Sequence, residues 1–410
     1  MSVPLPTDCS VITTYRCQMR CEMCGIWANP TDKDREIAAA DLAILPHLKV
    51  INITGGEPFV RKDIDEFAAM ALQKAELVVV STSGWHYNRI IEFCKRFPRV
   101  GIRVSIEGLS QNNDRLRGRP SGFDRALKLL LALKEMGHEN IGFGMTVSNY
   151  NSDDLLPLYR LARYLGFEFA TATFHNSFYF HKNDNVITNQ EHVIENFYRL
   201  AEAQLTERHP KSWFRALFNL GLIRYIRGQR RMLPCEAGLA NCFIYPYGDV
   251  YPCNGLEDRY WRKKIGNIRE VKSFDELWYS PAAEEVRKLV RTCPKNCWMV
   301  GTASPVLKKY IRATGPYAAR AKLLSLAGQP ISRDPGALPF FDVCQDPQQG
   351  DLADRKGPVD RPAEDGAEHF VGDFEEDDAL VHARPVQIHA AAAGAPPAHP
   401  PPRMNVDSNR

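Results

Sequence analysis

The sequence predicts an α/β fold, because six short apolar runs alternate with segments whose apolar residues recur at helical spacing. The runs are continuous and rich in β-branched residues, as expected for strands that are buried on both faces. Alternation at this length predicts parallel strands joined by crossover helices. Six such units favour a partial (β/α)6 TIM-like barrel, although a doubly wound sheet fits the same periodicity. A small Cys-rich domain and a disordered C-terminal tail are expected to follow.

The elements are predicted as follows. The strands cover residues 10–16, 50–54, 77–82, 100–106, 141–147 and 168–174, and the clearest helices cover residues 63–75, 86–97, 123–136 and 152–165. Residues 189–230 add two helices, and we interpret Arg227, Arg230 and Arg231 as a solvated helix end. The predicted domains are 9–208 for the barrel, 209–312 for the Cys-rich domain, 313–334 for a connecting helix or loop, and 335–410 for the tail.

The tail prediction rests on composition. Residues 351–410 contain an acidic run, an alanine tract and the segment PPAHPPPR. Such a segment buries too little apolar surface to offset the entropy of ordering its backbone.

Charge and cysteine content narrow the class of protein. The net charge is +3 and 25% of residues are charged, so neither nucleic acid nor membrane is expected as a partner. There is no apolar run of membrane-spanning length, and the N-terminus lacks the pattern of a secretory signal. We therefore expect a cytoplasmic protein with reduced cysteines. Its 11 cysteines are mostly clustered, which indicates metal or redox chemistry.

The first cluster follows the first predicted strand. Cys17, Cys21 and Cys24 have the spacing C-x3-C-x2-C, so three thiolates of one loop could bind three irons of a cubane. The fourth iron would stay open to a small molecule, whereas ordinary ferredoxins use four cysteines for each cluster. Zinc is the alternative, but structural zinc sites need four ligands, usually in C-x2-C pairs. The spacing therefore favours iron–sulfur.

This spacing and its position resemble the signature of the radical S-adenosylmethionine superfamily. The resemblance implies a [4Fe–4S] cluster whose open iron binds S-adenosylmethionine and whose electron cleaves it to a 5′-deoxyadenosyl radical, which takes hydrogen from a substrate. It also implies an external electron donor of flavodoxin or ferredoxin type. The protein positions a cofactor that carries the chemistry.

Further motifs resemble those of the superfamily. Gly55-Gly56-Glu57-Pro58 follows the second strand and is similar to the GGEP motif, whose backbone and glutamate would position the amino group of S-adenosylmethionine. Glycine would let that backbone approach the ligand. By the same resemblance Ser83, Ser105 and Arg117 are predicted cofactor contacts, and a salt bridge is the alternative for Arg117. All of them fall at the carboxyl ends of strands, where barrel enzymes build their sites.

A second group of cysteines lies near the end of the folded sequence. Cys235, Gly248 and Cys253 give C-x12-G-x4-C, which resembles the start of the auxiliary-cluster domain called SPASM, or its shorter twitch form. The resemblance implies an auxiliary [4Fe–4S] cluster bound by Cys235, Cys253, Cys293 and Cys297. Cys242 is a rival for any of these positions, and zinc is the alternative metal. We interpret Cys9 and Cys94 as small hydrophobic residues and Cys344 as a surface thiol.

The resemblance implies an enzyme: a radical S-adenosylmethionine oxidoreductase acting on a small polar molecule, with the auxiliary cluster accepting an electron. One alternative is an enzyme of the same superfamily that modifies a peptide or protein. The other is an iron–sulfur electron-transfer protein without turnover. No catalytic residue stands out; Glu107, His175 and His181 are candidate bases without a distinguishing spacing.

Overall fold

The computed structural model describes residues 3–255, 263–293 and 295–331, which lie within one compact unit. The nine strands of its sheet are β1 (Asp8–Ile12), β2 (Leu48–Thr54), β3 (Ala75–Thr82), β4 (Gly101–Ser105), β5 (Ile141–Val147), β6 (Glu168–Thr173), β7 (Asn241–Ile244), β8 (Asp249–Tyr251) and β9 (Gly266–Asn267). The predicted tail and Cys344 lie outside the described residues.

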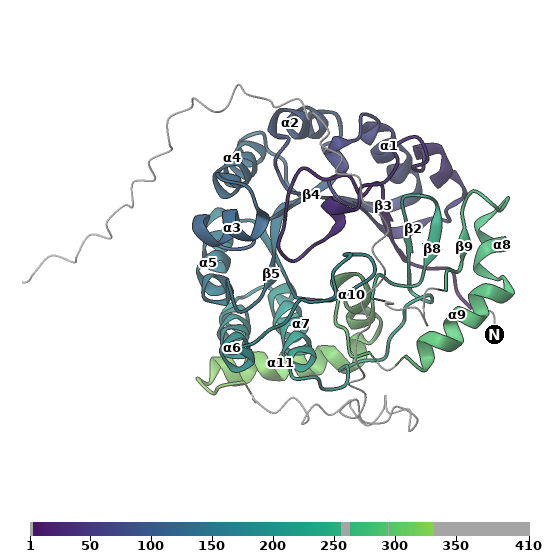
Figure 1. Ribbon diagram of the computed structural model, residues 1–410. Coiled ribbons are helices and arrows are strands. Elements are labelled where there is room, and N and C mark those ends of the chain that lie inside the picture. Colours follow the sequence, from purple (N-terminus) through teal and green to yellow (C-terminus); the bar gives the residue numbers. More distant parts are fainter. Residues whose placement is uncertain (1–2, 256–262, 294, 332–410) are drawn as a thin grey trace, which may run out of the picture. The chain divides into compact units, whose positions relative to one another are not determined.

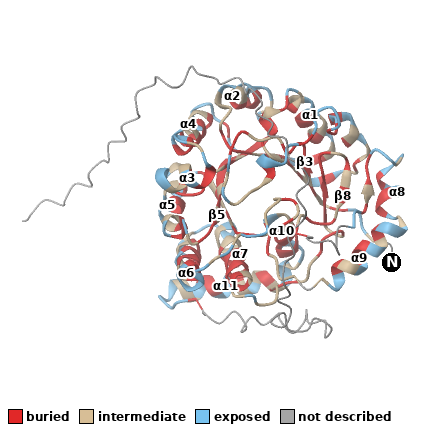
Figure 2. Ribbon diagram, in the orientation of Figure 1, coloured by how far each residue is buried: buried red, intermediate tan, exposed pale blue. Residues whose placement is uncertain are grey.

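Most of the α-helices form an outer layer, whereas α10 lies inside the ring that they make (Figure 1). They are α1 (Ile64–Lys74), α2 (Tyr87–Arg96), α3 (Ser110–Arg117), α4 (Gly122–Glu135), α5 (Leu155–Leu165), α6 (Gln190–Thr206), α7 (Pro210–Ile226), α8 (Phe274–Trp278), α9 (Pro281–Arg291), α10 (Val300–Lys309) and α11 (Ile311–Leu326). Figure 2 shows buried residues along the strands and the inner faces of these helices. In the part of the chain that the structure describes, no helix meets the length and hydropathy of a membrane span.

The strand order confirms the partial barrel. It runs β6-β5-β4-β3-β2-β1-β7-β8-β9, and every pairing from β6 to β7 is parallel. A doubly wound sheet would reverse its strand order at a switch point, whereas strands β1 to β6 follow one another in sequence. All six therefore wind in one direction with their helices outside, as in a barrel.

The Cys-rich segment continues the barrel sheet. Strand β7 pairs in parallel with β1, with Cys9 opposite Cys242, and β8 and β9 add antiparallel strands beyond it. Gly248 lies in the turn between β7 and β8 with φ of +90°, a conformation that favours glycine. The predicted boundary between residues 208 and 209 stays a prediction, since sheet pairing crosses it.

Two tryptophans attach this segment to the rest of the chain. Trp278 is fully buried, and its Nε1 donates to the carbonyl of Pro4 at 2.9 Å. Trp298 is also buried, and its Nε1 donates to the carbonyl of Phe218 on α7 at 2.9 Å. A Cβ at Gly221 would overlap the Trp298 indole, so this turn of α7 requires glycine.

Candidate active site

The loop after β1 carries the first three cysteines. It crosses the barrel opening in Figure 1, and Cys17, Cys21 and Cys24 are half-buried in it. Burial raises the pKa of all three thiols, that of Cys24 to about 12. Thiols of this kind stay protonated at neutral pH unless a metal replaces the proton. The loop therefore suits metal ligation better than nucleophilic catalysis.

A buried ion pair fastens both ends of this loop. The Glu36 carboxylate accepts hydrogen bonds from the hydroxyls of Thr14 and Thr31, each at 2.5 Å, and pairs with Arg61 at 2.7 Å. Arg61 also donates to the carbonyl of Ile37 at 2.9 Å. One carboxylate and one guanidinium thus join the chain before the cysteines to the chain after them.

Replacing Arg61 with Met is expected to lower the free energy of unfolding by about 1–3 kcal/mol, because Glu36 would lose one of its two arginine partners and keep only the partly exposed Arg16, 2.8 Å away. Chemical denaturation measures the loss, and iron content after reconstitution shows whether the loop still binds metal. The control is Arg163→Met, which breaks a half-exposed pair with Glu207 worth at most about 1 kcal/mol. Equal losses in the two variants would contradict an anchoring role for Arg61.

The two glycines of the GGEP-like segment lie against the loop. The amide of Gly56 donates to the carbonyl of Thr14 at 2.7 Å. A Cβ at Gly55 would overlap the backbone of Thr14, and one at Gly56 would overlap the backbone of Arg16. The sequence-based expectation was close approach to a ligand. In the structure the glycines permit close approach of the cysteine loop itself.

Glu57 is fully buried and is hydrogen-bonded on both oxygens. Oε1 accepts from the amide of Phe59 at 3.1 Å and the hydroxyl of Thr82 at 2.8 Å. Oε2 accepts from the amide and the hydroxyl of Ser83, at 2.7 and 2.5 Å. This carboxylate therefore holds the end of β3 and Ser83 in place. A direct contact between its oxygens and a cofactor would have to displace one of these bonds.

Arg117 lies beside the cysteine loop in a buried ion pair. Its Nη1 is 3.2 Å from Glu107 Oε1, and the other oxygen of Glu107 accepts from the amide of Thr146 at 2.6 Å. Burial opposes the charge of Arg117, but Cys21 and Glu107 raise its pKa above the ordinary value. Its Nε is buried without a hydrogen-bond partner in the described residues, as is Oε1 of Gln18. These unpaired atoms fit the presence of a polar cofactor next to the loop.

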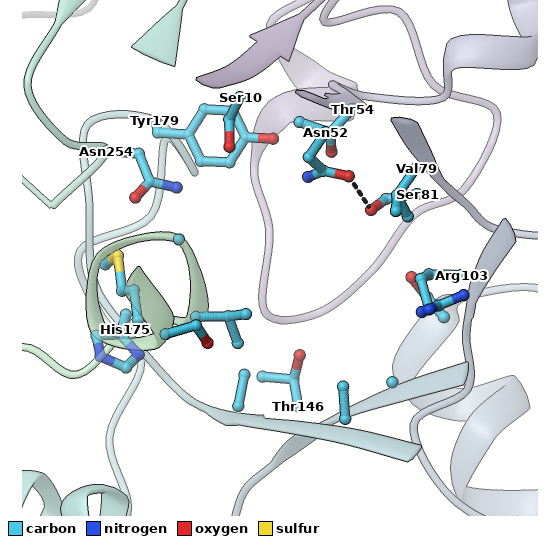
Figure 3. A pocket seen from close by; sticks show the side chains of 18 of the residues that line it. Ser10, Asn52, Thr54, Val79, Ser81, Arg103, Thr146, His175, Tyr179 and Asn254 are labelled. Atoms are coloured by element: carbon cyan, nitrogen blue, oxygen red, sulfur yellow. Dashed lines mark hydrogen bonds between the residues drawn. The ribbon is translucent and has the colours of Figure 1, made fainter. Parts of the chain in front are cut away.

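A cavity of about 590 Å³ occupies the barrel interior (Figure 3). Its wall carries short or polar side chains from the strands, where barrels usually have bulky branched ones. The residues facing it include Ser10, Asn52, Thr54, Ser81, Arg103, Ser105, Gly144, Thr146, Ala170 and Ala172. Figure 3 shows Arg103 across the cavity from His175 and Asn254. Predicted contact Ser105 thus faces an interior volume large enough for a small molecule.

The candidate bases are not equivalent. His175 is buried, its Nδ1 lies 2.8 Å from the carbonyl of Thr173, and its Nε2 accepts from the amide of Trp298 at 3.3 Å. Burial lowers the pKa of His175 to about 4, so the ring is neutral with both nitrogens engaged. It positions Trp298. His181 is not among the described residues lining the cavity, and Glu107 is bound to Arg117.

The second group of cysteines comes together around Cys253. Burial raises the pKa of this thiol, and the nearby thiols of Cys297, Cys235 and Cys293 raise it further. Within residues 3–255, 263–293 and 295–331, no three His, Cys, Asp or Glu side chains converge on a position for one metal ion. One buried and three half-buried thiols thus lie near one another, and such a group would suit a metal or an iron–sulfur cluster.

Arg231 lies against this group, where the sequence suggested a solvated helix end. Helix α7 ends at Ile226, and Nη1 of Arg231 donates to the carbonyl of Cys297. Its guanidinium carbon is 5.0 Å from the centre of the Trp298 ring. Nη2 is buried with no hydrogen-bond partner in the described structure. A cation with an unused donor beside the cysteines fits an anionic cluster, and no sequence spacing pointed to it.

Cys242 contacts Cys9 on the neighbouring strand. It is buried on β7 opposite Cys9 of β1, and the pKa of Cys9 is raised by a hydrogen bond with Cys242. Cys94 is buried on α2. Cys9 and Cys94 thus pack as the small hydrophobic residues that the sequence predicts.

Replacing Cys242 with Ala is therefore expected to leave iron binding unchanged, apart from a small loss of stability from the missing sulfur. Iron analysis after anaerobic reconstitution measures this, and Cys253→Ala is the matched variant that should lose the auxiliary cluster. If Cys242→Ala lost iron as Cys253→Ala does, Cys242 would be a ligand.

Comparison with known proteins gives two family matches. Residues 11–162 match the radical SAM superfamily, and residues 235–298 match SPASM, an iron–sulfur cluster-binding domain. The matched segments contain all seven cysteines that the sequence predicts as ligands.

Individual relatives are more distant. Fe-coproporphyrin III synthase of Methanosarcina barkeri is 32% identical over 36% of this chain, which spans only 39% of that protein. Pre-heme d1 synthase of Dinoroseobacter shibae is 25% identical over 78% of this chain and 83% of that protein. Among solved structures, anSMEcpe with AdoMet and a peptide bound has a TM-score of 0.54 at 13% identity, over 78% of this chain and 99% of that one. This last likeness is one of fold.

Proposed function

Because the chain belongs to the radical S-adenosylmethionine superfamily and carries a SPASM iron–sulfur domain, we propose that it is an oxidoreductase that removes hydrogen from a small molecule held inside the barrel. One observation carries the proposal. The interior cavity is lined by Cys24 of the first cysteine loop and also by Asn254 and Met299, which lie next to the auxiliary cysteines in sequence. A molecule in this cavity would lie between the two cysteine groups.

The residues of the first group would hold a cofactor of established chemistry. A reduced [4Fe–4S] cluster with bound S-adenosylmethionine supplies a 5′-deoxyadenosyl radical that takes a hydrogen atom from a carbon of the substrate. Cys17, Cys21 and Cys24 would bind the cluster, and Arg117 would supply positive charge for the carboxylate of S-adenosylmethionine. Glu57 holds Ser83 and the end of β3, and so shapes the wall that this cofactor would contact.

The second cysteine group would complete the oxidation. We propose Cys235, Cys253, Cys293 and Cys297 as ligands of an auxiliary [4Fe–4S] cluster that receives the electron left on the substrate. The substrate carbon thereby loses a hydrogen atom and an electron, and a proton leaves to solvent or a base. Four protein ligands would leave no iron open, which suits electron acceptance better than substrate binding.

Two cationic side chains in the cavity wall favour a substrate with anionic groups. Arg103 on β4 and Lys308 on α10 both line it. The guanidinium of Arg103 donates to the carbonyl oxygens of Ile102 and Asn140, each at 3.0 Å, and to Oδ1 of Asn140 at 2.7 Å, and has no carboxylate within salt-bridge distance in the described residues. The names of the curated relatives make iron porphyrins the first compounds to test.

The test begins with cofactor cleavage. The reconstituted protein, reduced with dithionite and given S-adenosylmethionine, is expected to form 5′-deoxyadenosine, detected by chromatography. Deoxyadenosine should rise further when an accepted substrate is added. If both clusters are filled and no deoxyadenosine forms, the enzymatic proposal fails and an electron-transfer role gains support.

A peptide is the second candidate substrate. The support is the fold shared with anSMEcpe, which was solved with a peptide bound. Incubation with candidate peptides under the same conditions, followed by mass spectrometry, separates the two. A mass loss of two hydrogens on a peptide, without turnover of any small molecule, would favour the peptide.

A further inference from the structure

The cavity inside the barrel extends to the amino ends of the strands. Its lining includes Asp8, the first residue of β1, and also Val50 and Leu77, which lie near the starts of β2 and β3. It also includes Ile12, the last residue of β1. Strand β1 has five residues, so its two ends are about 13 Å apart. An elongated molecule could therefore lie along the barrel axis, whereas barrel enzymes build their sites at the carboxyl ends alone.

The guanidinium of Arg103 lies at this amino end. It donates to the carbonyl of Asn140 at 3.0 Å and to Oδ1 of the same residue at 2.7 Å, and Asn140 immediately precedes β5. In the sheet Arg103 is opposite Gly142, which is in turn opposite Glu168, the first residue of β6. A third bond goes to the carbonyl of Ile102 at 3.0 Å. These bonds hold the guanidinium in place and use only part of its N–H donors.

The acid beside Arg103 is already shared by two other cations. Glu168 pairs with Lys211 at 2.6 Å and with Arg215 at 2.7 Å. Burial lowers the pKa of Arg103, Glu168 raises it and Arg215 lowers it, so these charges lie near one another. No carboxylate of the described residues is within salt-bridge distance of Arg103 itself. A bound anion would therefore supply the counter-charge that this buried cation lacks.

The other charged groups of the lining leave this preference for an anion in place. Glu107 is paired with Arg117 at 3.2 Å, outside the amino end of the barrel. Asp8 is the second acid of the lining, and Lys308 is an exposed cation of α10 that also faces the cavity. Asp8 is thus offset by Lys308, and the charge of Arg103 is left for a ligand.

We propose that Arg103 binds a carboxylate of the substrate, so that the substrate lies along the barrel axis with its reacting carbon at the carboxyl end. The inference rests on the proposed function and adds the length and orientation of the substrate. One guanidinium without an acid partner matches one negative charge, and its planar fork suits a carboxylate. Figure 3 shows Arg103 across the cavity from Asn254, which follows the proposed auxiliary ligand Cys253. The acid group would thus lie away from the auxiliary cysteines.

The binding experiment uses the full chain with both clusters filled and needs no turnover. The probe is 4′-azidobiphenyl-4-carboxylate, a rigid rod with an acid at one end, and its neutral counterpart is the carboxamide. Calorimetry is expected to show that the natural chain binds the carboxylate roughly tenfold or more tightly than the carboxamide, as a charge-assisted hydrogen bond would produce. Equal affinities for the two probes, or no binding of the carboxylate, would overturn the subsite.

Variants of Arg103 test which group causes the preference. Arg103→Gln removes the charge and keeps an amide donor, so the preference should disappear, whereas Arg103→Lys should retain part of it. The preference is a ratio of two affinities of one variant, so a smaller folded fraction does not change it. The control is Arg89→Gln, because Arg89 also donates to backbone carbonyls, those of Phe59 and Arg61, and does not line the cavity. Equal preferences in Arg103→Gln and the control would contradict the role of Arg103.

Irradiation of the bound probe tests its orientation, since the azide at the far end attaches to residues beside it. Mass spectrometry is expected to find the label at Tyr179 or Met299, which line the cavity and lie far from the amino ends of β2 and β3 in sequence. Label at Val50 or Leu77 would mean that the acid lies at the carboxyl end, and would overturn the proposed orientation. Absence of 5′-deoxyadenosine with dithionite would overturn the proposed function whatever the probe does, so the two failures are distinct.

Discussion

A variant with Cys17, Cys21 and Cys24 replaced by Ala is expected to form no 5′-deoxyadenosine above the background without enzyme. The proposed cluster would lose all three protein ligands, and no other cysteine among the described residues lies in this loop. Chromatography of the reduced reaction measures the loss. Iron analysis should show about four irons per chain, the content of one remaining [4Fe–4S] cluster.

The matched control for this variant is Cys94→Ala, which removes a thiol buried in α2 away from either group. It should keep the natural iron content and the natural rate of S-adenosylmethionine cleavage. Cleavage that persists in the triple variant would contradict the assignment of these cysteines. A triple variant that loses all its iron would show instead that the auxiliary group does not hold its cluster alone.

Replacing Cys293 and Cys297 with Ala should preserve cleavage of S-adenosylmethionine and abolish product formation. Cleavage of S-adenosylmethionine is expected to continue, because the first cysteine loop is unaltered. Product formation should fall to background, since the electron left on the substrate would lose its acceptor. Deoxyadenosine and product are measured in the same reaction, and their ratio should rise steeply compared with the natural chain.

A variant of Arg231 tests the auxiliary cluster without removing any of its cysteines. Arg231→Met keeps all four cysteines and removes the cation that donates to the carbonyl of Cys297. The reduction potential of the auxiliary cluster, followed by its paramagnetic resonance signal, should move to a more negative value. If the cysteine double variant lost cleavage and product to the same extent, the electron-accepting role would be contradicted.

The barrel could be predicted from the sequence because short runs rich in apolar and β-branched residues alternate with segments of helical spacing. Strand β3, for example, contains Leu77 to Val80, and such runs identify parallel strands without tertiary information. The cysteine positions could be predicted because their spacing is short and local. Helix α10 and the parallel pairing of β7 with β1 could not, since that pairing joins residues about 230 positions apart.

The surroundings of the site residues could not be predicted from the sequence either. Whether Ser10, Asn52 and Ala170 face a cavity depends on the register of the strands and on what fills the barrel. Glu57 illustrates the same limit, since nothing in its motif indicates that Phe59, Thr82 and Ser83 are its hydrogen-bond partners. Local patterns identify residue types, whereas the partners of a buried carboxylate are set by segments far away in sequence.

The close packing of the Trp298 indole on Gly221 limits which auxiliary segments can be exchanged between related enzymes. An auxiliary segment transplanted from a relative would bring its own residue at the position of Trp298, and the host helix would have to offer a matching gap. Here the gap exists because α7 has no side chain at Gly221. Chimeras in which only residues 235–298 are replaced should therefore fold poorly. Chimeras in which α7 is replaced together with that segment should fold better. Recombination in this lineage would then favour breakpoints before Pro210 over breakpoints at Cys235.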